Sequence, residues 1–216
     1  MLTDEQKHHY EVFGFLHLRQ VLTLNEVDTI RRESDRILAK LRDRKPFPGK
    51  KRQAEIPFFE HSPVLTKFIG DDRIYMIGVD LLGPDIILNA TEGNLHVGDT
   101  QWHGAVDRPH PVPAVKIAFY LEPNTKETGA LRVIPGSHKP EFGKMFEPLG
   151  RQHEDPSVMP FGVPGEEIPS VVLETQPGDL VVFPERLWHG AFGGRPGRTQ
   201  HAINYHANPA TDEQKE

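Results

Sequence analysis

The chain has 216 residues, of which 37% are hydrophobic, 26% are charged and none is cysteine, and its formal net charge at pH 7 is −6. This length and apolar content suit one domain with a sizeable core. A chain with this negative charge lacks the positive electrostatic field that binding to a nucleic acid polymer requires, so we expect no such partner. Without cysteine, disulfides and thiolate metal sites are excluded, so any metal must be held by histidine and oxygen ligands.

No run of about 18 apolar residues, the length needed to span a membrane, occurs in the chain. The first residues, MLTDEQKHHYEVFG, also lack the basic-then-apolar order of a signal peptide. We therefore expect a cytoplasmic protein without a membrane partner.

The first third of the chain is predicted to be helical. Residues 3–12 are polar helix formers that open at Thr3, an N-cap candidate. A second helix is expected over 25–44, where apolar residues recur at a spacing near 3.6 behind Asn25 as the N-cap. Basic residues with Pro and Gly over 44–54 indicate a loop, and 56–82 is again helical and apolar.

Short β-rich runs separated by turn residues begin near residue 84. Helices followed by strands at this spacing predict a mainly β (α+β) fold, an antiparallel sandwich or barrel with helices on one face. We expect one domain over 1–216, with a helical part to about 83, a β core over about 84–207 and a short polar tail. A long excursion over 140–170 is expected to be functional. The predicted strands are 85–90, 94–97, 114–121, 130–134, 171–175, 180–183 and 199–206.

Two histidines, His103 and His189, each follow a tryptophan near a predicted strand end. Either pair alone means little, because a single histidine on an apolar strand is more often structural than a ligand. Nine residues after His189 comes Arg198, behind a turn rich in Gly and Pro. A hairpin would bring this arginine back beside the histidine, and arginine is suited to bind a carboxylate through two hydrogen bonds.

Four segments in order resemble the phytanoyl-CoA dioxygenase-like (PhyH) family of Fe(II)/2-oxoglutarate oxygenases. They are GDTQWH from 98, VKIAFYLEPNTKETGALRVIPGSHK from 115, GDLVVFPERLWHGA from 178, and Arg198. The resemblance implies a double-stranded β-helix, the jelly-roll core of cupins. It also implies that His103 and His189 bind the iron, that Arg198 pairs with the C5 carboxylate of 2-oxoglutarate, and that Thr100 assists. His138, in the PGSH turn, is then structural.

The sequence departs from this family where its members carry His-x-Asp, because Ala105 stands in the place of the third, carboxylate ligand. The same change is typical of 2-oxoglutarate-dependent halogenases, in which chloride takes the open position on the iron. The sequence therefore predicts a halogenase that uses Fe(II), 2-oxoglutarate, chloride and O2 on an unactivated C–H bond of a free small metabolite, in secondary-metabolite biosynthesis. Asp107 as a ligand through a bulge is one alternative. A site made of His96, Asp99 and His103 is another.

Two other functions stay open. Ala105 could be an engineered or degenerate change in a hydroxylase, or the chain could be a non-catalytic cupin-like binding protein. The substrate is expected to be a free small molecule, a nucleotide or an amino acid, rather than one held on a carrier protein. Loops 44–54 and 140–165 would fix it, and Lys50, Lys51 and Arg52 would meet an anionic group if they turned inward.

Overall fold

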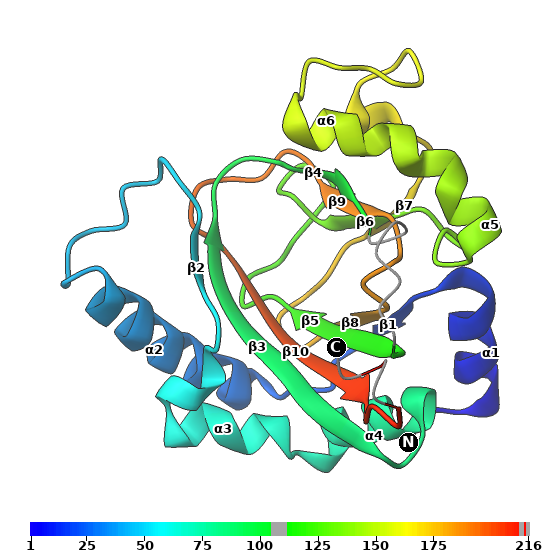
Figure 1. Ribbon diagram of the computed structural model, residues 1–216. Coiled ribbons are helices and arrows are strands. Elements are labelled where there is room, and N and C mark those ends of the chain that lie inside the picture. The colour runs from blue at the N-terminus through cyan, green and yellow to red at the C-terminus, as the bar shows by residue number, and fades with distance from the viewer. Residues whose placement is uncertain (105–111, 212–213, 215–216) are drawn as a thin grey trace.

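Two antiparallel sheets face each other in the computed structural model, which describes residues 1–104, 112–211 and 214 (Figure 1). Within the described residues, the larger sheet contains β1 (Leu16–Leu18), β8 (Leu180–Phe183), β5 (Ala114–Phe119), β10 (Arg198–Ala207), β3 (Ile86–His96) and β2 (Gln53–Glu55), in that order. The smaller sheet contains β4 (Thr100–His103), β9 (His189–Ala191), β6 (Leu131–Val133) and β7 (Val171–Leu173). The two sheets form the expected jelly-roll core.

Helices cover the outer faces of both sheets (Figure 1). Apolar residues of α2, α3 and α4 pack in one cluster with the outward side chains of β5, β8 and β10. A second cluster lies between the two sheets, and a third lies between the smaller sheet and the excursion over 140–170. The helices are α1 (Asp4–Phe13), α2 (Leu24–Leu41), η1 (Phe59–His61), α3 (Pro63–Ile69), α4 (Asp72–Leu82), α5 (Pro140–Gly143), η2 (Lys144–Leu149), α6 (Gly150–Glu154) and η3 (Gly165–Glu167).

Strand β5 shows how the sequence separates the two faces of the larger sheet. Successive side chains of a strand point to opposite faces. Ile117 and Phe119 belong to the cluster under the helices, whereas Lys116, Ala118 and Tyr120 line a cavity between the sheets. Strand β5 therefore presents polar side chains as well as Ala118 to the cavity, while its outer face is apolar.

The helix starts follow from capping. Thr3 caps α1 and forms a capping box with Gln6, as the sequence predicts. The predicted N-cap of the second helix, Asn25, is wrong, because Thr23 forms a capping box with Glu26 and starts the helix two residues earlier. A capping box satisfies two free backbone donors at once, and Asn25 has no glutamate or glutamine three residues later that could form one.

The strand predictions are confirmed in most positions and wrong in two respects. The runs 85–90 and 94–97 form one continuous strand, β3, because Gly93 continues the ladder opposite His201. Its Cα lies under the ring of Phe58, where a Cβ would come within 2.3 Å, so this glycine marks a close contact and not a turn. Four short strands, β1, β2, β4 and β9, are missing from the prediction, and two of these lie in the part expected to be helical.

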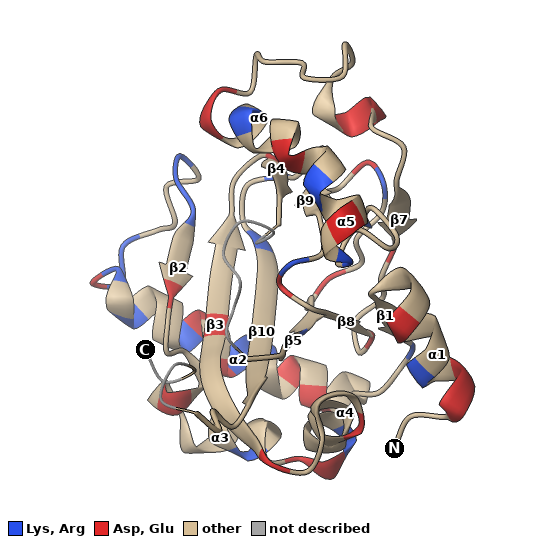
Figure 2. Ribbon diagram, turned by 45° about the vertical axis from the view of Figure 1, so that its right-hand side comes forward, with Lys and Arg blue, Asp and Glu red and all other residues tan. Residues whose placement is uncertain are grey.

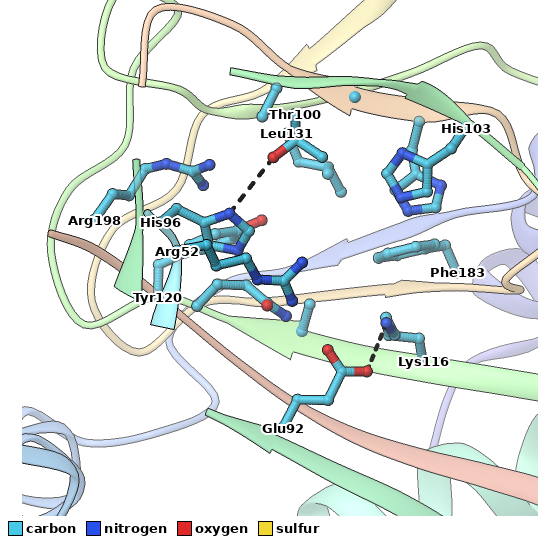
Figure 3. Close-up of a pocket in the computed structure, with 15 residues that line it drawn as sticks. Arg52, Glu92, His96, Thr100, His103, Lys116, Tyr120, Leu131, Phe183 and Arg198 are labelled. Atoms are coloured by element: carbon cyan, nitrogen blue, oxygen red, sulfur yellow. Dashed lines mark hydrogen bonds and ion pairs between the residues drawn. The ribbon is translucent and has the colours of Figure 1, made fainter. Parts of the chain in front are cut away.

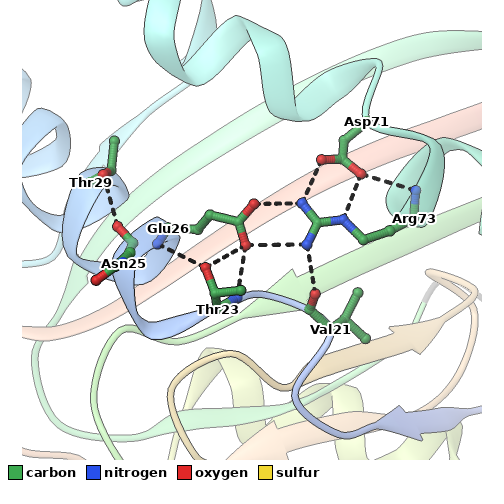
Figure 4. Close-up of polar contacts among 7 residues, drawn as sticks. All are labelled: Val21, Thr23, Asn25, Glu26, Thr29, Asp71 and Arg73. Carbon is green, nitrogen blue, oxygen red and sulfur yellow. Dashed lines mark hydrogen bonds and ion pairs between the residues drawn. The ribbon is translucent and has the colours of Figure 1, made fainter.

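An exposed polar network joins the start of α2 to the start of α4 (Figure 4). The Arg73 guanidinium donates to Glu26 and to Asp71, with Nη2 2.6 Å from an oxygen of each, and it also donates to the backbone of Val21. Hydrogen bonds from Arg73 are the main cause that lowers the pKa of Glu26 to about 2.

Arg73→Met is expected to reduce the free energy of unfolding by about 1 kcal/mol at pH 7, after allowance for solvent screening. A folded pKa below the usual value of about 4.3 means that Glu26 stabilises the fold above that pH, and that this contribution fades as pH falls toward 2. The difference in the free energy of unfolding between wild type and variant, measured by urea unfolding, should therefore shrink as the pH falls from 6 to 3.5. Lys67→Met, at an exposed lysine of α3, is the control, and a difference that does not change with pH would contradict the prediction.

Candidate functional site

The pairing of β4 with β9 brings the two predicted ligands together. His103 is the register partner of His189, and their ring centroids lie 4.0 Å apart. The Nδ1 atoms lie 2.8 Å and 2.7 Å from the backbone oxygens of Gln101 and Leu187. An Nδ1–H that donates to a carbonyl fixes the ring and leaves Nε2 as the ligating nitrogen, which is the usual arrangement at metal sites.

The tryptophans that precede the two histidines anchor the excursion over 140–170. Because side chains alternate along a strand, Trp102 and Trp188 point away from the cavity. Their indole N–H groups donate to the backbone oxygens of Gly165 at 2.7 Å and Gly143 at 2.9 Å. The Trp-His pattern thus has a physical reason, since one face of each strand holds the covering segment and the other faces the cavity.

Ser137 and Gly104 position the backbone around the two histidines. The amide of Trp188 donates to the hydroxyl of Ser137, in the PGSH turn, at 2.9 Å. Gly104 lies against the segment before His189, where a Cβ would come within 3.1 Å of the backbone oxygen of Arg186. His138 lies outside the cavity, and its Nε2 is 3.1 Å from the backbone oxygen of Glu11.

Both imidazoles are neutral at physiological pH. Burial is the main cause that lowers the pKa of His103 to about 4, and the nearby His153 adds to it. Burial also holds the pKa of His189 well below its ordinary value, with the neighbouring His103 as a further cause. Only a neutral imidazole can donate its lone pair to a metal, so the site is prepared for ligation.

Arg198 lies at the other end of the same cavity, opposite the imidazoles (Figure 3). Its side chain is buried, and its Nε has no hydrogen-bond partner among the described residues. Gly129, from the TGAL motif, makes room for it, because a Cβ there would come within 2.8 Å of the Arg198 Nε. A buried donor without a partner is costly, so this guanidinium is arranged to receive an anion.

His96 and Thr100 lie beside Arg198. His96 is the register partner of Arg198, and its Nδ1 is 3.5 Å from the Thr100 hydroxyl (Figure 3). Burial first, and then the charges of Arg198 and Arg52, lower the pKa of His96 to about 3. His96 is therefore a neutral part of the cavity wall, in the buried sheet position that its apolar neighbours in the sequence predict.

The cavity between the sheets has a volume of about 130 Å³ and is lined by both imidazoles, Arg198, Thr100 and His96. Arg52 also lines it, although the residue as a whole is exposed. Lys50 and Lys51 are exposed in the same basic loop before β2, which Figure 2 shows in blue, and they are not among the lining residues. The excursion over 140–170 covers the metal end, where the ring of His153 lies 5.7 Å from that of His103.

Ala105 and Asp107 lie outside the described residues, so the third coordination position is not described. The alternative site of His96, Asp99 and His103 does not form, because among the described residues no three acidic or histidine side chains are placed to hold a metal. Asp99 instead accepts a hydrogen bond from the amide of Gly193 at 2.7 Å.

The residues present fit an Fe(II) ion and a dicarboxylate cosubstrate. Two neutral imidazoles with fixed rings form part of a nitrogen and oxygen donor set of the kind that non-haem iron uses. The unpartnered buried Nε of Arg198 suits one end of a dicarboxylate, while the other end would reach toward the imidazoles. His103 and His189 would hold the metal, and Arg198, with Thr100 beside it, would hold the distal carboxylate.

A jelly roll that places two imidazoles and a buried arginine in one cavity defines the class of Fe(II)/2-oxoglutarate-dependent oxygenases. The chain belongs to the family described as phytanoyl-CoA dioxygenase (PhyH), whose model matches residues 10–202. Its sequence is 25% identical to an ectoine dioxygenase of Sphingopyxis alaskensis in an alignment of 205 positions that covers 83% of this chain and 67% of that protein. An ectoine dioxygenase of Nocardia farcinica is 27% identical in an alignment of 213 positions that covers 90% of this chain and 67% of that protein.

Solved structures agree with the fold. Iron-bound EctD from S. alaskensis aligns with a TM-score of 0.73 at 20% identity, over 95% of this chain and 77% of that one. HygX from Streptomyces hygroscopicus, solved with nickel and 2-oxoglutarate, aligns with a TM-score of 0.72 at 23% identity, over 96% and 88% of the two chains. No helix in the described part of the chain is long and apolar enough to span a membrane.

Part of the cavity wall was not predicted from the sequence. Glu92, Lys116, Tyr120 and Phe183 line the cavity, and although the last three lie within the quoted segments, the resemblance gave none of the four a role. The available signal was the alternation on β5, because Lys116 and Tyr120 occupy the opposite face from Ile117 and Phe119.

Proposed function

We propose that this chain oxidises an aliphatic C–H bond of a free small molecule with O2 and 2-oxoglutarate. The observation that carries the proposal is one cavity that joins two neutral imidazoles to a buried arginine with an unpartnered Nε. Iron(II) with 2-oxoglutarate, when bound, supplies the O2 activation that such a reaction needs. The chain itself fixes the two imidazole rings, pairs Arg198 with the distal carboxylate and covers the metal end with the 140–170 segment.

Hydroxylation is the product type that the comparisons favour. The curated relatives named above are ectoine dioxygenases, and a structure of EctD was solved with 2-oxoglutarate and 5-hydroxyectoine. A hydroxylase needs a further ligand, or water, at the position that Ala105 leaves without a carboxylate. Assays with isotopically labelled O2 should then give a product that carries one oxygen atom from O2 and does not depend on halide.

Halogenation is the second candidate, and the alanine at position 105 of the sequence favours it. A methyl group cannot bind a metal, so a halide could take that position with the same single negative charge. The protein is incubated with Fe(II), 2-oxoglutarate, O2 and a substrate, and with either chloride or bromide as the only halide. A halogenase should then give a product whose mass changes with the halide that is supplied. An oxygen adduct that is indifferent to halide would decide for hydroxylation.

Ala105→Asp is expected to abolish halogenation, because a carboxylate there would compete for the halide's position. The measurement is the halogenated product by mass spectrometry, together with the shift that chloride causes in the anaerobic absorption band of iron with 2-oxoglutarate. Ala105→Ser, which introduces no carboxylate, is the matched control. Halogenation by the Ala105→Asp variant at the wild-type rate would contradict the prediction.

A cupin-like binding protein without turnover stays the third candidate. It requires that metal and ligand bind but that no succinate forms with any substrate. Succinate formation that depends on both Fe(II) and O2 would exclude it.

A further inference from the structure

The floor of the cavity carries a buried ion pair that takes no part in the metal and cosubstrate binding described above. Lys116 Nζ lies 2.7 Å from Glu92 Oε1, and the two side chains are only 18% and 10% exposed. Asn204 donates its amide to the same Glu92 oxygen at 3.0 Å. Figure 3 shows the pair across the cavity from His103.

The strand register explains how the pair forms and why there is space above it. Glu92 on β3 and Ala118 on β5 are both register partners of Ala202 on the intervening strand β10, and Lys116 is the partner of Asn204. The two long side chains therefore meet diagonally across β10. The small side chains of Ala118 and Ala202 leave room next to them for a ligand.

A buried ion pair is a poor way to stabilise a sheet. The cost of removing both charges from water roughly cancels their attraction, and apolar side chains of similar volume are often as stable. Fixed charges in the wall of a cavity are, in contrast, the usual way to orient a polar ligand. The placement of Lys116 and Glu92 thus points to recognition.

The pair is also close to the candidate metal ligands. Phe183 is the register partner of Lys116, and its ring centroid lies 4.8 Å from that of His189. A group held by Lys116 would therefore be about one side chain away from the imidazoles, where a reacting carbon has to lie.

Arg52 places a second cation near Glu92. Its guanidinium is held by the Asn94 side-chain oxygen, with Nε at 3.1 Å and Nη2 at 2.7 Å. Burial raises the pKa of Glu92, but Lys116, Asn204 and Arg52 outweigh it, so the net shift is downward and the carboxylate stays charged. Besides Arg198, which the cosubstrate would occupy, the wall therefore combines two cations with one anion.

We propose that this cavity selects a small zwitterion as the primary substrate, with an anionic group bound by Lys116 and Arg52 and an ammonium group bound by Glu92. The inference rests on the proposed function, since it concerns the substrate of the same site. A ligand with only negative charge would face Glu92, and one with only positive charge would face two cations and the metal. A zwitterion meets an opposite charge at each end.

The first test uses the wild-type protein with small metabolites sorted by ion exchange into zwitterionic, anionic, cationic and neutral pools. Each pool is added to protein with Fe(II), 2-oxoglutarate and O2, and succinate is measured. The zwitterionic pool alone should raise succinate formation over the level without substrate by about 10-fold or more, the size of effect expected of one charge-assisted contact. Stimulation by another pool only, equal stimulation by all, or stimulation by none would overturn the inference.

The second test separates recognition from a structural role. The stimulating compound is compared with its N-acetyl and its carboxamide derivatives. In the wild type each derivative should lose about 30-fold in kcat/KM, as expected when one charge-assisted hydrogen bond is removed. Glu92→Gln should remove most of the penalty for N-acetylation, and Lys116→Met most of the penalty for the carboxamide. Lys67→Met, at an exposed lysine of α3 outside the cavity, is the control and should leave both penalties unchanged.

A structural pair would give a different result, with lower thermal stability in both variants but wild-type penalties for both derivatives. That result would overturn the inference and leave the proposed function intact. Failure of the proposed function is recognised separately, because then no assay forms succinate and no absorption band of iron with 2-oxoglutarate appears.

Discussion

His189→Ala is expected to lower the affinity for Fe(II) by on the order of 100-fold or more, because changes even to the partners of metal ligands cost 10- to 100-fold. The wild-type ring is held by its Nδ1 contact with the Leu187 backbone and by packing on Phe183, so its position toward the metal is fixed. The variant should also lose Fe(II)-dependent succinate formation, because it no longer holds the iron. Anaerobic titration with Fe(II), followed by the absorption band in the presence of 2-oxoglutarate, measures the affinity.

His138→Gln is the matched control for this variant. His138 is half-buried, contacts the backbone of Glu11 and lies outside the cavity, so its replacement should change neither metal affinity nor succinate formation. Circular dichroism of both variants checks that each is folded. An iron affinity in His189→Ala equal to that of the wild type would place the metal elsewhere.

Arg198→Ala is expected to weaken 2-oxoglutarate binding by about 2 kcal/mol, or roughly 30-fold, while iron affinity changes little. The side chain is buried and its Nε lacks a partner among the described residues, so a cosubstrate carboxylate would gain a charge-assisted contact in a dry site. Arg198→Lys keeps the charge but loses the forked geometry of the guanidinium, so its 2-oxoglutarate affinity should lie between those of the wild type and of Arg198→Ala. The measurement is a titration of the metal-loaded protein with 2-oxoglutarate under anaerobic conditions.

Arg195→Ala tests whether the effect is specific to the cavity. Arg195 is exposed in the turn before β10, so its loss should leave 2-oxoglutarate affinity unchanged. Arg52→Ala adds a second comparison, since Arg52 also lines the cavity. If Arg52→Ala lowers 2-oxoglutarate affinity and Arg198→Ala does not, the cosubstrate carboxylate belongs to Arg52.

The identification of the family depends on short local patterns that the sequence carries openly. The Trp-His pairs, the TGAL and PGSH turns and Arg198 each do a local task, such as tying down the covering segment or making room for the guanidinium. Helix caps such as Thr3 are equally local, because the residues that form them lie three positions apart. The resemblance to the family rested on these patterns, and the match over residues 10–202 confirms it.

Short strands escaped the sequence analysis for a related reason. β4 and β9 have four and three residues, too few for an alternating pattern to emerge, and they are strands only because they pair with each other. In β3 the polar stretch around Gly93 resembles a turn locally. Pairing with β10 along nearly its whole length overrides that preference.

The sequence by itself therefore determined the jelly-roll class, and it predicted the two histidines and the arginine as site residues, because each belongs to a motif of neighbouring residues. Only the tertiary structure decided the floor of the cavity. Glu92 and Lys116 lie 24 positions apart in the chain and meet because both flank β10 in a fixed register. Contacts of this kind depend on which strands pair and with what offset. The hydrogen bonds of the ladder join backbone groups that nearly all residue types share, so they leave no local signal of the offset in the sequence.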